Sequence, residues 1–336
     1  MASFVDLLLQ FPYFGLTIFF FYWSPPLASI VYRIRFASAG PRKDIYEWTT
    51  AMVQFLGVRI RHQGKQTLYK KERCVYLCNH RSWADFFVDL HLTQGLAAPM
   101  SRTMVFFAFP VFMSICIVLK GVLLFKRGTI ADKTKFNKWL DDSLGNSPVS
   151  CLLVYPEGHR STKAKSLPLK RGMLYYAHSR GLPVQIIHTA GKEAVLSEKR
   201  MRASYGQTLV TGFSQPIQSK DFKDFEAFSA EVQRSWDALW TEVYSANPSA
   251  LPPLVQEDVP TADYPPSMRT GMLLVSLAAI ALFLAFVALL AYITGPVMSL
   301  FPAPLRVPLI LFKLSWHAAS FLYCRAKDTP GKVKAA

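Results

Sequence analysis

The sequence has few of the features that mark metal or nucleic-acid sites. Its five cysteines are scattered, with no Cys-x-x-Cys pair and no cluster with histidine, which argues against a zinc site. Scattered thiols are typical of a reduced, cytosol-facing domain rather than of a disulfide scaffold. No basic run carries interleaved aromatic residues, so the signature of a nucleic-acid groove is missing.

Acidic residues are also scarce. The 336 residues include 22 Asp and Glu against 38 Lys and Arg, which gives a net charge of +16 at pH 7. Such a balance favours anionic partners. Because 51% of the residues are hydrophobic, an anionic membrane surface or a phosphorylated substrate fits better than nucleic acid. Length and composition together predict one catalytic domain of ordinary size with a few membrane segments.

The N-terminal segment, residues 1–45, is predicted to associate with the membrane. Residues 3–23 are mostly apolar and no positively charged segment precedes them, so a cleaved signal peptide is not expected. Pro25-Pro26 is expected to break the segment. It either spans the bilayer, dips into it as a pair of helices, or packs as a buried helix. The basic residues that follow, Arg33 among them, place the next domain in the cytosol.

A C-terminal membrane hairpin is predicted over residues 271–325, after a Pro-rich linker over residues 247–270. Residues 272–294 carry no charge and would form a helix roughly 35 Å long, enough to span a bilayer. The second segment, residues 307–324, contains Lys313, and either spans or lies in the interface.

The tail, residues 326–336, is basic and therefore favours a hairpin with both ends in the cytosol. Its pattern Lys332-x-Lys334 looks like a dilysine retrieval signal, which implies the endoplasmic-reticulum membrane with the catalytic domain facing the cytosol.

Between these segments, residues 46–246 are predicted to form the catalytic domain. Short apolar runs alternate with amphipathic stretches, a pattern typical of an α/β fold with a mostly parallel sheet flanked by helices. Sites in such folds lie at the carboxyl ends of the strands. Strands are expected at 58–62, 74–78, 121–125, 150–155, 184–188 and 207–213, and helices at 44–56, 84–92, 132–144, 170–180 and 222–244.

Residues 103–125 are apolar enough to resemble a membrane span, but a single crossing is rejected. It would place Asp85 and Glu157 on opposite sides of the membrane, although both are candidate site residues. The segment is therefore expected to be core, or a surface that dips into one leaflet.

The central motif runs from Cys78 to Asp85 and contains a histidine and an acid five residues apart. Five residues turn a helix by about 140°, so His80 and Asp85 would point apart on a regular helix. They can meet only if His80 lies before the helix and Asp85 in its first turn. A histidine oriented by a carboxylate is the usual arrangement of a general base.

Two further motifs each place an arginine beside a glycine at the end of a predicted strand. The first is Gly121-x-x-x-Phe125-x-Arg127, and the second is Tyr155-Pro156-Glu157-Gly158-His159-Arg160-Ser161. Glycine lets backbone N–H groups approach an anion, and the arginine fork binds phosphate.

In this order, the three motifs resemble those of the glycerolipid acyltransferases, the family that includes lysophosphatidic acid (1-acylglycerol-3-phosphate) acyltransferases. The first family motif, NHxxxxD, is matched by Asn79, His80 and Asp85. The second is matched by Gly121 to Arg127, and the third, FPEGTRS, by residues 155–161 with His159 in place of threonine. A fourth, proline-bearing motif is matched only in part, by Leu182-Pro183-Val184.

The resemblance implies transfer of a fatty acyl group from acyl-CoA to the free hydroxyl of a lysophospholipid, with lysophosphatidic acid as the preferred acceptor. In this interpretation His80 is the base and Asp85 orients it. The acceptor phosphate would be bound by Arg127, Gly158 and Arg160, with supporting roles for Asn79, Gly121, Glu157 and Ser161. No metal or cofactor is expected, since acyl-CoA is a co-substrate, and the lipid bilayer is the other partner.

Two alternatives stay open. One is a remodelling enzyme that acylates a different lysophospholipid, of the lysocardiolipin or lysophosphatidylinositol type. The other is a non-enzymatic lipid-binding scaffold, against which the intact His80 and Asp85 argue, because a binding protein needs no base.

Overall fold

The structure is a computed structural model that describes residues 4–35, 41–118, 121–126, 132–145, 147, 149–257 and 266–325. The predicted phosphate ligand Arg127 and the lysines of the predicted retrieval signal lie outside these residues. The predicted domain boundaries stay predictions.

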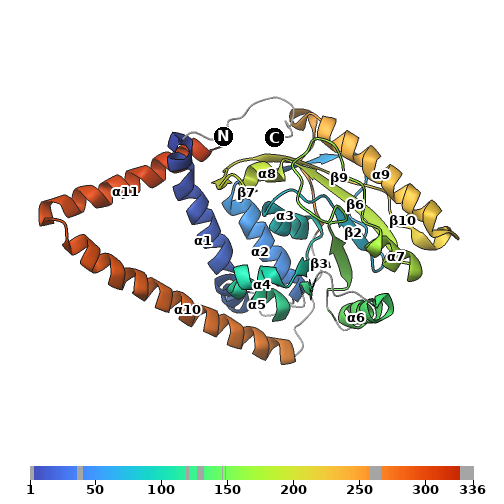
Figure 1. The fold of residues 1–336 in the computed structure, drawn as a ribbon, viewed down its shortest axis with the longest axis horizontal. Helices are drawn as coiled ribbons and strands as arrows, with labels where there is room; N and C mark the ends of the chain where they lie inside the picture. The colour runs from blue at the N-terminus through green and yellow to red at the C-terminus, as the bar shows by residue number, and fades with distance from the viewer. Residues whose placement is uncertain are drawn as a thin grey trace.

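A mixed sheet forms the centre of the described chain (Figure 1). Its strand order is β1-β9-β6-β2-β5-β3-β4, and β10 pairs with β6. The strands are β1 (Arg59–Gln63), β2 (Val75–Cys78), β3 (Ala97–Arg102), β4 (Leu123–Phe125), β5 (Cys151–Val154), β6 (Pro183–Ala190), β9 (Thr208–Phe213) and β10 (Ile217–Gln218). A separate small hairpin consists of β7 (Leu196–Ser197) and β8 (Arg202–Ala203).

The strands from β6 to β4 run parallel, which confirms the predicted mostly parallel sheet. The exceptions are β9 and β10, which pair antiparallel with β6, and β1, which runs parallel to β9. Because the central strands are parallel, the segments that follow β2, β5 and β6 meet at one edge of the sheet, where the first and third motifs lie.

The central strand β2 shows how the sheet is buried on both faces. Tyr76 and Cys78 pack in a core cluster with α1, α2, α3 and α5, whereas Val75 and Leu77 pack in a second cluster with α7 and α9. The alternation follows from the two-residue period of a strand.

The helices are α1 (Phe4–Arg35), α2 (Pro41–Phe55), α3 (Ala84–Leu92), α4 (Met104–Ala108), α5 (Pro110–Val118), α6 (Lys133–Gly145), α7 (Gly172–Ser179), α8 (Lys192–Val195), α9 (Phe225–Ser245), α10 (Pro266–Ser299) and α11 (Ala303–Cys324), with short 3-10 turns η1 (Ser219–Asp221) and η2 (Pro248–Ala250).

Residues 103–125 do not form one helix, which confirms the rejection of a single membrane crossing. Helix α4 ends before Phe109, whose non-helical backbone separates it from α5, and the strand β4 follows. The side chains of Met104 and Phe107 on α4 are mostly exposed. The exposed face of α4 therefore fits the predicted surface that dips into one leaflet.

The prediction that Pro25-Pro26 breaks the first segment is wrong, because α1 continues through both residues. A proline inside a helix costs about 3 kcal/mol, so packing must offset the lost hydrogen bonds. Tight contacts flank the prolines: Phe21 stacks on Phe112, and the indole N–H of Trp48 donates to Ser24 Oγ at 2.9 Å. Tertiary packing thus overrides the local rule.

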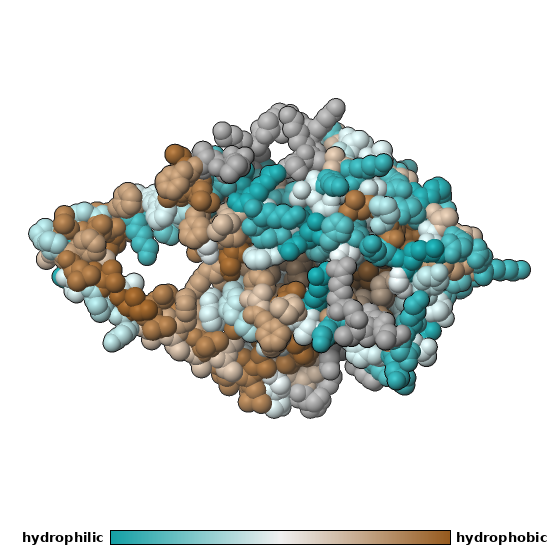
Figure 2. Space-filling view, in the orientation of Figure 1, coloured by the Kyte–Doolittle hydropathy of each residue, from teal (hydrophilic) through white to brown (hydrophobic). Residues whose placement is uncertain are grey.

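Helices α10 and α11 project from the domain and diverge from α1, which packs against both (Figure 1). Trp23 of α1 contacts Phe283 of α10, and Tyr13 of α1 contacts Phe321 of α11. By length and composition, α10, α11 and residues 4–28 of α1 could each cross a membrane. Figure 2 shows hydrophobic residues gathered over these helices and over α4 and α5, and polar residues over the opposite end of the domain.

Candidate active site

His80 and Asp85 meet in the way that their spacing predicts. His80 lies in the segment after β2, and Asp85 lies in the first turn of α3. His80 Nδ1 is 2.7 Å from Asp85 Oδ2, which also accepts hydrogen bonds from the backbone N–H groups of Arg81 at 2.6 Å and Ser82 at 3.0 Å. An ionised carboxylate can only accept, so Nδ1 carries the proton and Nε2 is left as the basic nitrogen.

Asp85 is kept ionised by Lys192, which follows the neighbouring strand β6. Burial raises the pKa of Asp85, but the charge of Lys192 and the hydrogen bond with His80 outweigh it and hold the pKa below its usual value. Lys192 Nζ lies 3.3 Å from Asp85 Oδ1, 2.8 Å from Asp89 Oδ2 and 2.7 Å from the carbonyl oxygen of Asn79. Lys192 is completely buried and follows β6 directly.

One lysine therefore faces two buried carboxylates. Burial raises the pKa of Asp89 to about 7, against the opposing charge of Lys192. Asp89 Oδ2 also accepts a hydrogen bond from the hydroxyl of Tyr155 at 3.0 Å. The ring of Tyr155 in turn stacks on His80, with 4.3 Å between ring centroids and an interplanar angle of 18°. The carboxylate on one side and the aromatic ring on the other restrict the orientation of the imidazole.

The loop after β5 fixes the backbone of His80. Glu157 Oε1 accepts the N–H of His80 at 2.7 Å, and the N–H of Ser161 donates to the carbonyl oxygen of His80 at 2.9 Å. Glu157 Oε2 is buried and has no hydrogen-bond partner among the described residues. Burial raises the pKa of Glu157 to about 7, which fits a carboxyl group with one unpartnered oxygen. The first and third motifs thus form one structural unit.

Asn79 ties this unit to β6. Its Nδ2 donates to the carbonyl oxygen of Thr189 at 3.0 Å, and the N–H of Thr189 donates back to Asn79 Oδ1 at 3.0 Å. This reciprocal pair reproduces the backbone pairing of the neighbouring strands just beyond the end of β2. Asn79 therefore has a structural role in placing His80.

The predicted phosphate-binding residues have different environments. Arg160 Nη1 lies 2.5 Å from Glu198 Oε1, and the Arg160 side chain is 33% exposed. Gly158 has a φ of +75°, a backbone conformation that side chains disfavour. Gly121 lies elsewhere: a Cβ at this position would come within 2.4 Å of Ile45 Cδ1, so any larger residue would displace the end of the Ile45 side chain on α2.

Comparison with known proteins identifies the central part of the chain. Residues 59–187 match the acyltransferase family model. These residues form an acyltransferase domain. The resemblance inferred from the motifs is thereby confirmed, since the residues that match the family model include all three motifs.

The acyltransferase domain is similar to proteins named 1-acyl-sn-glycerol-3-phosphate acyltransferase. The protein from Cocos nucifera is 24% identical over 173 residues, or 52% of this chain. The alpha protein from Homo sapiens is 22% identical over 188 residues, or 56% of this chain. The matches span 54% and 65% of those two proteins, so this chain covers less than two thirds of either.

The fold resembles the crystal structure of PlsC, the 1-acyl-sn-glycerophosphate (LPA) acyltransferase from Thermotoga maritima. The TM-score is 0.55 at 18% identity, and the match covers 73% of this chain and 99% of the other. At this identity the likeness establishes the fold alone.

A buried ion pair that the motifs do not predict connects the acyltransferase domain to its C-terminal helix. Arg81 is almost fully buried, and its guanidinium contacts both carboxylate oxygens of Glu193, at 2.5 and 3.2 Å. It also donates to the carbonyl oxygen of Lys163 at 2.8 Å and lies over the ring of Trp240 on α9. These contacts occupy the guanidinium, so Arg81 positions the His80 segment.

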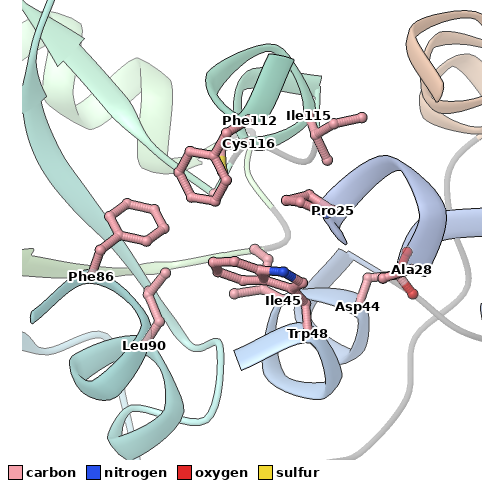
Figure 3. A pocket seen from close by; sticks show the side chains of 11 residues that line it. Pro25, Ala28, Asp44, Ile45, Trp48, Phe86, Leu90, Phe112, Ile115 and Cys116 are labelled. Carbon is pink, nitrogen blue, oxygen red and sulfur yellow. The ribbon is translucent and has the colours of Figure 1, made fainter. Parts of the chain in front are cut away.

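A small apolar hollow lies on the other side of α3, between the acyltransferase domain and the helices α1 and α2 (Figure 3). Phe86 and Leu90 of α3 point into it, opposite Trp48 and Phe112 (Figure 3). Its volume is about 30 Å³, similar to the volume per molecule in liquid water, so it accommodates no acyl chain in this conformation. Among the described residues, no group of three or more His, Cys, Asp or Glu side chains is arranged to bind a metal ion.

Proposed function

We propose that the protein transfers a fatty acyl group from acyl-CoA to the free hydroxyl of a lysophospholipid, with lysophosphatidic acid as the preferred acceptor. The observation that carries the proposal is the hydrogen bond between His80 Nδ1 and Asp85, which leaves Nε2 as the base. The loop with Arg160 lies beside it, because Ser161 is bonded to the His80 backbone. The names of the relatives agree with this assignment.

In the proposed reaction, His80 Nε2 removes the proton of the acceptor hydroxyl as its oxygen attacks the thioester carbonyl. The resulting imidazolium is stabilised by Asp85. When the tetrahedral intermediate collapses, the C–S bond breaks and the proton passes from His80 to the CoA thiolate. The products are the acylated lipid and free CoA, and His80 is returned to its neutral form.

Arg160 and Arg127, with the backbone at Gly158, are proposed to bind the acceptor phosphate. Glu157 is proposed to order the loop that carries Arg160, because its Oε1 binds the His80 N–H and its Oε2 is buried. The helices α1, α10 and α11 would anchor the domain to the membrane. We propose the endoplasmic reticulum as that membrane, from the pattern Lys332-x-Lys334. The basic segments that flank the apolar helices favour a domain that faces the cytosol.

A remodelling activity is the second candidate, and one observation favours it. The positive charge of Arg160 is already paired with Glu198, which weakens the case for an acceptor with a doubly charged phosphate. Lysophospholipids with a phosphodiester head group carry a single negative charge on phosphate. The acceptor panel described next distinguishes the two activities.

The test is thiol release from oleoyl-CoA by the full-length protein in membranes. The panel of acceptors contains lysophosphatidate, lysophosphatidylcholine, lysophosphatidylinositol and glycerol-3-phosphate. Replacing His80 by alanine should lower turnover by roughly 10²–10⁴-fold, as expected for a lost general base. His317, exposed on α11, provides a matched control, and His317→Ala should retain activity. Full activity of His80→Ala would contradict the assignment.

A further inference from the structure

The carboxylate of Glu198 occupies a position suited to an anion. Glu198 lies in the turn between β7 and β8, more than thirty residues after the third motif. Its Oε1 is 2.5 Å from Arg160 Nη1, and its Oε2 accepts the backbone N–H of Trp83 at 3.3 Å. Trp83 is the residue that precedes α3, so Glu198 bridges the start of that helix and Arg160. An arginine and a backbone N–H at a helix start are groups that also bind phosphate.

We propose that Glu198 tunes the acceptor specificity of the enzyme by weakening the binding of phosphate monoesters relative to phosphodiesters. Without an acceptor, Glu198 binds Arg160, and with one bound, its negative charge opposes the negative charge of the acceptor phosphate. Glu198 therefore raises the KM for phosphate-bearing acceptors, and does so more for phosphate monoesters than for phosphodiesters. This inference rests on the proposed function, in which Arg160 contacts the acceptor phosphate.

Glu198 raises KM whether or not the acceptor phosphate displaces it from Arg160. If the phosphate shares Arg160 with Glu198, the two anions repel each other at close range. If the phosphate displaces Glu198, the contact with Arg160 is lost and the carboxylate stays on the neighbouring turn. In both cases the cost grows with the charge of the ligand. A phosphate monoester carries nearly two negative charges at pH 8, because its second pKa is about 6, whereas a phosphodiester carries one.

Glutamine at position 198 isolates the charge from the structure. Its amide oxygen can still accept the N–H of Trp83, and its size matches that of glutamate. The pair with Arg160 is partly exposed, with 33% of the arginine and 16% of the glutamate side chain accessible. A partly exposed ion pair contributes little to stability, so Glu198→Gln should fold normally.

The experiment compares KM values of wild type and Glu198→Gln at pH 8 for lysophosphatidate and lysophosphatidylglycerol, presented in the same neutral detergent micelles. We expect KM to fall about 5-fold for lysophosphatidate and about 2-fold for lysophosphatidylglycerol, because the repulsion scales with ligand charge. High salt should reduce the difference by screening. Glu226→Gln is the matched control, since Glu226 pairs with the exposed Arg171 on other helices, and it should change neither KM.

Equal KM values before and after the substitution would overturn the inference. A rise of KM for both lipids would overturn it as well, because it would mean that Glu198 orients Arg160 for binding. A larger fall for lysophosphatidylglycerol than for lysophosphatidate would contradict the electrostatic argument.

A binding measurement separates this inference from the proposed function. Both lipids are titrated into His80→Ala and into His80→Ala/Glu198→Gln, where no turnover is required. A Kd that falls more for lysophosphatidate than for lysophosphatidylglycerol supports the role of Glu198 even if no acyl transfer is found. An unchanged ratio of Kd values, or no binding of either lipid to either variant, contradicts it.

Discussion

Replacing Lys192 by methionine should be among the most damaging single substitutions in the domain. Methionine has a similar length but no charge, so Asp85 and Asp89 would face each other without a buried cation. Removing one partner of a buried ion pair costs about 3–5 kcal/mol, chiefly because the remaining charge stays desolvated. We expect a cost of this size for Lys192→Met, because Lys192 contacts the buried carboxylates of Asp85 and Asp89 and the carbonyl oxygen of Asn79.

The cost should depend on pH in a defined direction. Burial already raises the pKa of Asp89 to about 7 with Lys192 present, and loss of the lysine charge would raise it further. The native variant would then bind more protons than its unfolded chain over the range above the ordinary carboxyl pKa. Its stability therefore falls as pH rises through this range. We expect the full cost of about 3–5 kcal/mol at pH 8.5 and a smaller cost at pH 6.

Removing the second carboxylate should restore part of the loss. In Lys192→Met/Asp89→Asn, Asp85 is the remaining charge, and it still accepts hydrogen bonds from His80, Arg81 and Ser82. The double variant should be at least about 1 kcal/mol more stable than Lys192→Met at pH 8.5, because an uncompensated buried charge is gone.

The assay is urea unfolding of the full-length protein in detergent micelles, followed by tryptophan fluorescence at pH 6 and pH 8.5. Lys70→Met is the matched control, because Lys70 pairs with the largely exposed Glu257, and such pairs contribute about 0–1 kcal/mol. The reasoning fails if Lys192→Met lies within about 1 kcal/mol of wild type at pH 8.5, or if its cost does not decrease toward pH 6.

Two further substitutions test other parts of the site by the same unfolding assay. Gly121→Ala should cost about 1 kcal/mol or less, because the added Cβ meets the flexible end of the Ile45 side chain, and Ile45→Val, which lacks Cδ1, should recover part of this cost. A cost above about 3 kcal/mol, or no recovery in the double variant, would contradict the packing argument. Glu157→Gln keeps an acceptor for the His80 N–H but removes a carboxyl whose pKa burial raises to about 7. Wild type loses stability at this group as pH rises from about 4.5 to 7, so the variant should gain roughly 2–3 kcal/mol relative to wild type between pH 5 and pH 8, and a difference independent of pH would count against the raised pKa.

The sequence predicts the parts of the site that depend on local geometry. The spacing of His80 and Asp85 is a short-range constraint, and only one placement relative to the helix start lets them meet. Asp89 was also within reach of such reasoning, because it lies one helical turn after Asp85 on the same face. Asp89 is not among the predicted site residues, because the partners of its carboxylate, Lys192 and Tyr155, lie far along the chain.

Other features depend on contacts that no local pattern reveals. Lys192 and Glu193 lie over a hundred residues after the first motif, and only the pairing of β2 with β6 brings them to it. The strand β3 is absent from the expected strands. It contains Pro99, a residue that argues against a strand inside a sheet, yet β3 pairs with β5 on one side and β4 on the other. As with the prolines of α1, long-range packing decides the outcome.

The charges around His80 indicate which cation can serve the substrate. Of the three cations that the described part of the site places near the motif, Lys192 and Arg81 are fully buried and bound to buried carboxylates. Exchanging either partner for a ligand would leave a desolvated carboxylate behind, at a cost of several kcal/mol. Arg160 is different, because both it and Glu198 reach solvent, and a displaced Glu198 would be hydrated. Of these three cations, only Arg160 can exchange its carboxylate partner for a substrate phosphate at a low cost in free energy. We therefore expect the charge of the substrate to affect binding at Arg160.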